Sequence, residues 1–284
     1  MVYLILNIVL SSSFILLIRW SQVRKLDVYT VGATNYIVAG LTAVMMIVPM
    51  GHPGAVVSMS GFWGAINGLG YFIAFFFLVH VAHWKGAALT AVISRLSILL
   101  AVVCGIVIWG ESPCRVQAAG IVIACPALLL VGGRDSATLS VRLPWQSVLA
   151  MLCLFLAAGS SRVAQEAFKH MCRPDEWMTY VLAAFGLTAV MSVVMLIVRR
   201  RRPRIMEIVT GTLIGLANIF QVQAILAALA IFEGFVVFPV TMAGGVILTV
   251  AVSALLLNER ISRRSYIGIG LGILSVILLN FTGK

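Results

Sequence analysis

The second half of this chain repeats the first. The segment 86–120 aligns with the segment 234–268 at a constant offset of 148 residues, and Asp27 aligns with Asp175 at the same offset. Each copy contains five apolar spans. An odd number of spans means that the second copy enters a bilayer from the side opposite the first, so the sequence predicts inverted repeats. The two predicted domains are a first repeat, 1–137, and a second, inverted repeat, 138–284.

The composition indicates an integral membrane protein. Hydrophobic residues make up 62% of the 284 residues, charged residues make up 10%, and the mean hydropathy is +1.10. A helix needs about 20 residues to cross a hydrocarbon core of roughly 30 Å, so ten spans leave only short connectors and no soluble catalytic domain. The expected fold is an all-α integral membrane protein with ten transmembrane helices, at 2–20, 29–50, 60–82, 86–109, 115–132, 145–167, 177–198, 208–230, 234–257 and 265–282.

The net charge of +11 does not require a nucleic-acid partner. Fourteen Lys and Arg residues fall in connectors on one side of the predicted bundle and four on the other. Connectors rich in these residues stay in the cytoplasm, so the bias favours both termini outside. The basic run 199–204 could also contact anionic lipid. We expect no nucleic acid, a lipid bilayer as the surroundings, and a multi-pass protein of the cell membrane, in bacteria the inner membrane.

No metal or cofactor site is expected from the residue spacing. The five cysteines show no CxxC pattern and are interpreted as packing residues. His80 and His83 are three residues apart, but no third ligand lies near them in the sequence. The phosphate-binding pattern GxxxxGK[ST] is absent, so ATP is not expected to drive the protein.

Both halves carry an apolar span that ends in a glutamate, then a short polar turn and a final span with glycine. The residues are Trp109-Gly110-Glu111 with Gln117 and Gly120, and Asn258-Glu259-Arg260 with Gly268. This paired pattern resembles the EamA-like branch of the drug/metabolite transporter superfamily over nearly the whole chain. The resemblance implies two inverted five-helix repeats around a central cavity, lined mainly by the first, third and fourth helices of each half. It also implies export of amino acids, metabolites or drugs, or exchange of sugar conjugates, and termini in the cytoplasm, opposite to the charge bias.

Arg95 is the most informative single residue. It lies about nine residues, or roughly 14 Å of helix rise, into its predicted span, near the middle of the bilayer. A guanidinium costs several kcal/mol there unless it faces protein or water. Either it binds an anionic group of a substrate, or it pairs with a carboxylate or with helix-end carbonyls and holds the repeats together. Its repeat counterpart is Ala243, so the symmetry is broken at this position.

The sixth predicted helix carries Arg162, Gln165, Glu166 and Lys169 on one face. Arg162 lies roughly 25 Å along this helix from Trp145, which suits a span end that reaches into the headgroups. The alternative is a coupling or gating role, with Glu166 as a proton or cation site or as a gating partner of Arg95. Depth along the helices argues against a direct static pair with Arg95.

The third and eighth predicted helices contain amides and a phenol that need partners in a dry bilayer. Asn67 and Tyr71 share one helix face, and Asn218 and Gln221 share another. These four residues either line a substrate site or form interhelical hydrogen bonds of roughly 1 kcal/mol each. Both helices also contain small-xxx-small pairs, which predict close helix contacts. The pairs are Gly64 with Gly68 and Gly211 with Gly215.

Two further features concern the helix ends and bends. Pro239, followed by Thr241, frees a backbone carbonyl and makes its span easy to bend, as a gating hinge would require. Glu111 and Glu259 lie at span ends, where capping or pairing with Arg115 and Arg263 is the favoured role.

These features predict a secondary active transporter of a small polar or amphipathic metabolite, working as an exporter by alternating access between the repeats. Arg95 would hold an anionic group, while Asn67, Tyr71, Asn218 and Gln221 would line the site. The alternative is a flippase for a lipid-linked sugar or a phospholipid. An intramembrane enzyme is the least favoured reading, because no acid, nucleophile or multi-His set matches Arg95 in depth. The duplication places both halves in one chain, so a monomer is expected.

Overall fold

The computed structural model describes residues 1–47, 58–85, 93–132, 145–201, 203–257 and 263–279. All secondary structure in these ranges is helical, which confirms the all-α fold class. The short 3₁₀ helix η3 (Pro174–Glu176) precedes α8. The α-helices are α1 (Val2–Val23), α2 (Val28–Ile47), α3 (Met59–Lys85), α5 (Ile98–Val107), α6 (Arg115–Gly132), α7 (Trp145–Met171), α8 (Trp177–Arg199), α9 (Ile205–Leu229), α10 (Gly234–Leu257) and α11 (Arg263–Leu279).

Seven of the described helices are long and apolar enough to cross a membrane, as a multi-pass membrane protein requires. Three further apolar stretches, Ile93–Val107, Arg115–Ala127 and Tyr266–Leu279, are shorter. The ten predicted spans match these helices to within a few residues, except in the span 86–109. Residues 86–92, like Glu259 and Arg260, lie outside the described residues.

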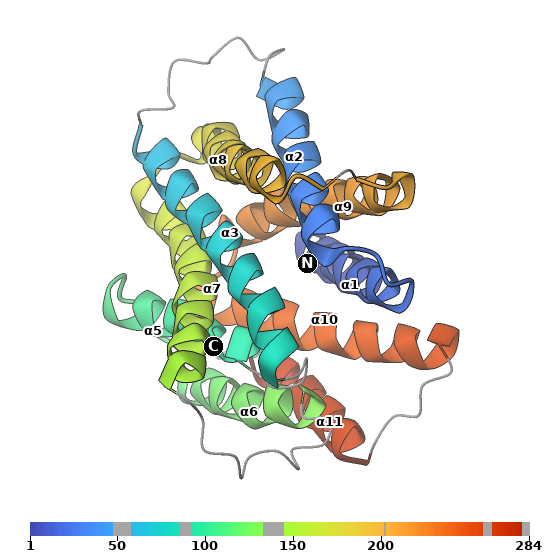
Figure 1. Cartoon of the computed structure of the whole chain (residues 1–284). Helices are drawn as coiled ribbons and strands as arrows, with labels where there is room; N and C mark the ends of the chain where they lie inside the picture. The colour runs from blue at the N-terminus through green and yellow to red at the C-terminus, as the bar shows by residue number, and fades with distance from the viewer. Residues whose placement is uncertain (48–57, 86–92, 133–144, 202, 258–262, 280–284) are drawn as a thin grey trace.

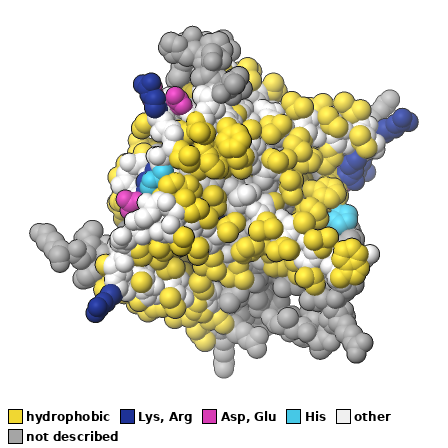
Figure 2. Space-filling view, turned by 90° about the vertical axis from the view of Figure 1, so that its left-hand side faces the viewer, with side chains coloured by type: hydrophobic (Ala, Val, Ile, Leu, Met, Phe, Trp, Pro, Cys, Tyr) yellow, Lys and Arg dark blue, Asp and Glu magenta, His cyan; other side chains and the backbone are white. Residues whose placement is uncertain are grey.

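The helices pack against one another in pairs (Figure 1). Helix α3 lies along α7 and α8, while α2 packs against α8 and α9. Helix α1 packs against α9 and α10, and α5 packs against α7 and α10. Helices α6 and α11 pack against each other. In Figure 2 the viewed face is mainly hydrophobic and its Lys and Arg side chains lie toward the edges, which suits a surface in contact with lipid.

Glycines permit close helix approaches. A Cβ atom added to Gly68 of α3 would lie 2.2 Å from the carbonyl oxygen of Ala184 in α8. A Cβ atom on Gly215 of α9 would lie 2.6 Å from the carbonyl oxygen of Asn35 in α2. Any larger residue at these positions would push the helices apart, so the predicted close contacts are confirmed. Gly64 and Gly211 lie one turn earlier against the same two helices.

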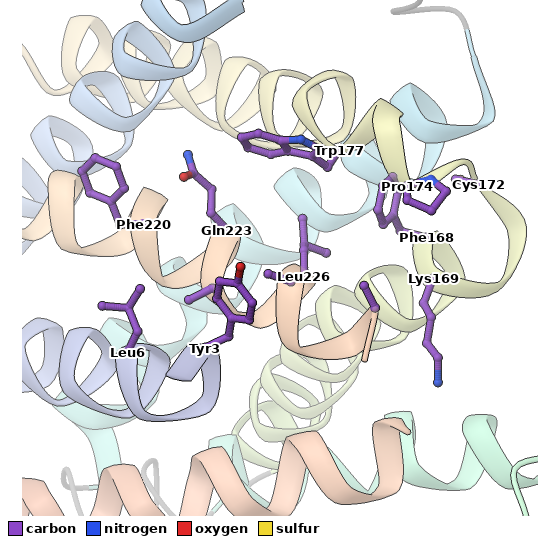
Figure 3. A pocket seen from close by; sticks show the side chains of 13 residues that line it. Tyr3, Leu6, Phe168, Lys169, Cys172, Pro174, Trp177, Phe220, Gln223 and Leu226 are labelled. Atoms are coloured by element: carbon purple, nitrogen blue, oxygen red, sulfur yellow. The ribbon is translucent and has the colours of Figure 1, made fainter. Parts of the chain in front are cut away.

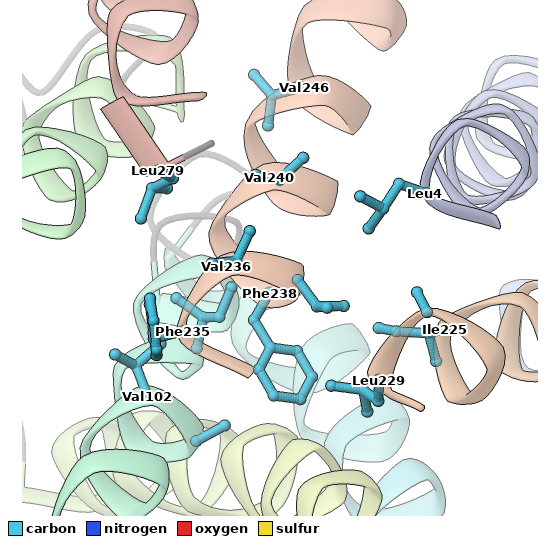
Figure 4. Close-up of a cluster of buried hydrophobic side chains, with 14 residues drawn as sticks. Leu4, Val102, Ile225, Leu229, Phe235, Val236, Phe238, Val240, Val246 and Leu279 are labelled. Atoms are coloured by element: carbon cyan, nitrogen blue, oxygen red, sulfur yellow. The ribbon is translucent and has the colours of Figure 1, made fainter. Parts of the chain in front are cut away.

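The buried hydrophobic side chains form two clusters. The first surrounds the start of α10, where Phe238 extends toward Leu229 of α9 and Phe235 lies on the opposite side (Figure 4), and Leu4 of α1 belongs to the same cluster. Val102 of α5 and residues of α11 complete it on the other side. The second cluster joins α2, α8 and α9 and contains the fully buried Tyr180, Phe185 and Ile219.

Candidate functional site

Arg95 lies inside the bundle just ahead of α5. It belongs to a helical turn, 93–96, which a turn at Ser97 separates from α5. Its Nη1 atom is buried and has no hydrogen-bond partner. Because a buried donor without a partner is costly, this Nη1 atom is suited to donate to an anion or to water. The Nη1 atom therefore makes no hydrogen bond to a carboxylate or to a helix-end carbonyl, which the alternative structural role would require.

Helices α3 and α7 place a strip of polar side chains between them. The Tyr71 hydroxyl accepts a hydrogen bond from Gln165 Nε2 at 2.8 Å. Asn67 is fully buried, and neither its amide nitrogen nor its amide oxygen has a partner. Gln165 Oε1 and Arg162 Nε are also buried without partners. Arg162 therefore does not simply reach the headgroups, because part of its guanidinium stays inside the protein.

The two predicted residues of α9 have different surroundings. Asn218 Nδ2 donates to Asn35 Oδ1 of α2 at 3.2 Å, so this amide forms an interhelical hydrogen bond. Gln221 Oε1 is buried without a partner, while the Gln221 carbonyl accepts a hydrogen bond from Asn7 Nδ2 of α1 at 2.9 Å. Asn218 thus forms a side-chain hydrogen bond between helices, whereas the Gln221 amide oxygen one turn later has no partner.

Three residues that the sequence analysis did not single out connect these helices. The Tyr36 hydroxyl of α2 donates to the Tyr71 carbonyl of α3 at 3.3 Å. Asn35 of α2, the residue before Tyr36, accepts a hydrogen bond from Asn218 of α9. Asn7 of α1 donates one to the Gln221 carbonyl of α9. Their signal in the sequence was a polar side chain inside an apolar span, the same signal that marked Asn67.

Helix α10 runs without interruption through Pro239. Thr241 is buried, and its hydroxyl donates to the Val237 carbonyl of its own helix at 2.7 Å. The described break in helical geometry lies instead at Ser97, where the Ser97 carbonyl accepts from the Leu100 amide at 3.2 Å in a tighter turn.

A charged cluster lies where the end of α7 meets the start of α10. Lys169 Nζ is 3.0 Å from Glu111 Oε1 and 3.5 Å from Glu166 Oε1, and it also contacts Glu233. His170 Nε2 lies 3.1 Å from Glu166 Oε1. The Trp109 ring stacks on the His170 ring with the planes 7° apart. Glu166, predicted to act in coupling or gating, is thus enclosed by charged groups rather than paired with Arg95.

Glu111 caps α10, as its position at a span end predicted. Its carboxylate accepts hydrogen bonds from the amides of Gly234 at 2.9 Å and Phe235 at 3.1 Å. Burial would raise the pKa of this carboxyl, but hydrogen bonds with surrounding groups outweigh burial and lower the pKa to about 2. The carboxylate is therefore ionised at neutral pH and complements the positive end of the helix.

A cavity with a volume of about 540 Å³ lies between α1, α7, α8 and α9 (Figure 3). Tyr3, Phe168, Trp177 and Phe220 give it a mainly apolar wall, and Gln223 adds an amide. The five predicted substrate-binding residues do not line this cavity. It is large enough for a small organic molecule or part of a lipid chain.

Comparison with known proteins supports the fold. No family model matches the chain, and no curated protein matches its sequence. One solved structure, described only as "Crystal structure of protein", superposes with a TM-score of 0.75 over 98% of this chain and 95% of that chain, at 14% identity. At that identity the likeness shows that the two chains share a fold, and nothing about activity follows from it.

Proposed function

We propose that this protein is a secondary transporter that exports a small polar or amphipathic metabolite. The observation that carries the proposal is a set of buried polar atoms without partners on helices from both halves of the chain. In hydrocarbon such groups are costly, so they are retained where water or a ligand can reach them. The residues are Asn67, Arg95, Arg162, Gln165 and Gln221.

The helix packing supports the two inverted repeats, 1–137 and 138–284. If α1, α2, α3, α5 and α6 correspond in order to α7, α8, α9, α10 and α11, the contacts occur in matched pairs. Helix α3 meets α7 as α9 meets α1, α3 meets α8 as α9 meets α2, and α5 meets α7 as α10 meets α1. A rocking motion of one half against the other is the expected means of alternating access.

In this mechanism Arg95 binds an anionic group of the substrate, because its free Nη1 points to no protein partner. Asn67 and Gln221 supply further hydrogen bonds from opposite halves. Tyr71 and Asn218 hold the surrounding helices in place through Gln165 and Asn35. Coupling to a cation involves the Glu166 cluster, which joins α7 to α10.

The test is a thermal-shift screen of the purified protein against amino acids, organic acids, nucleosides and sugar phosphates. Wild type is compared with Arg95→Ala and with the control Arg173→Ala, whose side chain is 77% exposed. A stabilising compound that loses its effect only in Arg95→Ala is then tested for exchange across proteoliposomes. A wild type without response to any anionic compound, or a response that survives Arg95→Ala, would contradict the assigned role of Arg95.

The second candidate is a flippase for a lipid-linked sugar or a phospholipid, with Arg95 holding the phosphate. The apolar cavity lined by Tyr3, Trp177 and Phe220 favours it, because such a wall suits an acyl chain. Movement of fluorescent phospholipid between the leaflets of proteoliposomes distinguishes the two functions. A transporter of soluble metabolites leaves this rate at that of protein-free vesicles.

A further inference from the structure

A second polar centre lies apart from the unpartnered groups described above. It consists of three carboxylates, one ammonium and one imidazole. The side chains of Glu111 and Glu166 are 2% and 0% exposed, and that of Lys169 is 16% exposed. Glu233 is half exposed at the rim. When the two buried carboxylates are ionised, one negative charge remains after Lys169 is counted. Buried charges in proteins are paired or bind a cation, so this excess calls for an occupant.

The geometry suits a metal ion. One ligand atom each from Glu111, Glu166 and His170 can lie within 4.8 Å of the other two. His170 Nε2 is 3.6 Å from Glu111 Oε1 and 3.1 Å from Glu166 Oε1. Imidazole nitrogen with carboxylate oxygen is a ligand set that zinc and similar divalent ions accept.

A separate observation points to a missing ligand. Glu166 Oε2 is fully buried and has no hydrogen-bond partner, although the side chain lies among charged groups. This oxygen lies beside Gly234, where an added Cβ atom would be only 2.2 Å away. The Gly234 amide in turn donates to Glu111. Both carboxylates are therefore held against the start of α10 with one oxygen still unsatisfied.

We propose that Glu111, Glu166 and His170 form a divalent-cation site, in which the Lys169 ammonium is a tethered cation that the metal displaces. Lys169 already contacts both buried carboxylates at hydrogen-bond or ion-pair distance. It also contacts the half-exposed Glu233, which gives the ammonium an acceptor outside the site when a metal enters. The site takes its ligands from the α5–α6 connection and from α7, so a bound ion links the two halves of the chain.

The experiment measures the unfolding temperature of the purified full-length protein as Zn²⁺ or Mn²⁺ alone is added at fixed pH. We expect the ion to stabilise wild type. Glu166→Gln and His170→Gln each remove a ligand, so the half-saturating concentration should rise at least about tenfold. Lys169→Gln removes the competing cation, so that concentration should fall. The readout needs no transport substrate, and its result is separate from that of the proposed function.

Asp175→Asn is the matched control. Its carboxylate is 66% exposed and pairs with Arg173 outside the cluster, so the metal response should stay at the wild-type value. An equal response in wild type, Glu166→Gln and His170→Gln would overturn the proposal. If Glu166→Gln does not fold, Lys169→Gln still decides: the absence of a metal-dependent shift in that variant would overturn the proposal.

Discussion

The Tyr71 hydroxyl accepts a hydrogen bond from the Gln165 amide at 2.8 Å, which joins α3 to α7 inside the bundle. Tyr71→Phe removes the acceptor and leaves a second buried group of Gln165 without a partner. We expect a loss of about 0.6 to 1.7 kcal/mol in the free energy of unfolding, the range of hydrogen bonds between membrane helices. Denaturant unfolding in mixed micelles measures it, and a double-mutant cycle with Gln165→Leu isolates the pair.

Tyr3→Phe serves as the control for this measurement. Tyr3 is also a tyrosine of a predicted membrane span, but its side chain is 43% exposed. A loss in Tyr3→Phe as large as that in Tyr71→Phe would show that the α3–α7 hydrogen bond contributes nothing specific.

Gly68→Ala should destabilise the protein because the added methyl group would meet the Ala184 carbonyl. The expected loss is about 1 to 3 kcal/mol, typical of an overpacked core. Gly186→Ala is the control, since an added Cβ atom there has no neighbour within 4 Å. That variant should keep or slightly gain stability through the higher helix propensity of alanine. Thermal unfolding of both in the same detergent makes the comparison, and equal midpoints would contradict the close contact of α3 with α8.

Arg95→Met should separate stability from ligand response. Methionine fills similar space without a buried unpaired charge, so we expect the variant to be at least as stable as wild type. The stabilisation by any anionic compound that acts on wild type should disappear. Thermal unfolding with and without that compound gives both values. A loss of stability of about 2 kcal/mol or more would instead assign Arg95 a structural role.

Asp27→Ala should be more costly than the same change at Asp175, with which Asp27 aligns at an offset of 148 residues. Asp27 caps α2 through the Thr30 amide at 3.1 Å and pairs with Arg199 and Arg201 at 3.3 and 3.1 Å. Loss of a helix cap costs about 0.5 to 2 kcal/mol. The described ion pair of Asp175 is with an exposed arginine, so its loss should be small. Unfolding at low and high salt compares the two, and similar losses would refute the capping role.

Helix positions were predictable from the sequence because they depend on local composition. A run of about 20 apolar residues has few alternatives in a bilayer, and the ends of α7 to α10 fall close to the predicted limits. The tight contacts of Gly68 and Gly215 were predictable for the same reason, since small residues spaced by four have one common use in membrane helices.

Long-range partners could not be derived in this way. Glu166 and His170 share a helix face by spacing, but their third partner, Glu111, comes from the other half of the chain. Asn218 forms its hydrogen bond with Asn35 only because α2 lies against α9. Pro239 was predicted to make its span easy to bend, and α10 is continuous through it. Its neighbours Val237 and Phe238 are fully buried, and a proline near the start of a helix removes few hydrogen bonds.

The parallel stack of Trp109 on His170 gives this protein an optical reporter of its own. Indole fluorescence is sensitive to the charge of a ring in direct contact with it, so a change at the imidazole alters the emission of Trp109. Because the Trp109 ring contacts His170 at the edge of the cluster, binding of an ion to the cluster can be followed in the unlabelled protein. The other five tryptophans supply a background that Trp109→Phe subtracts.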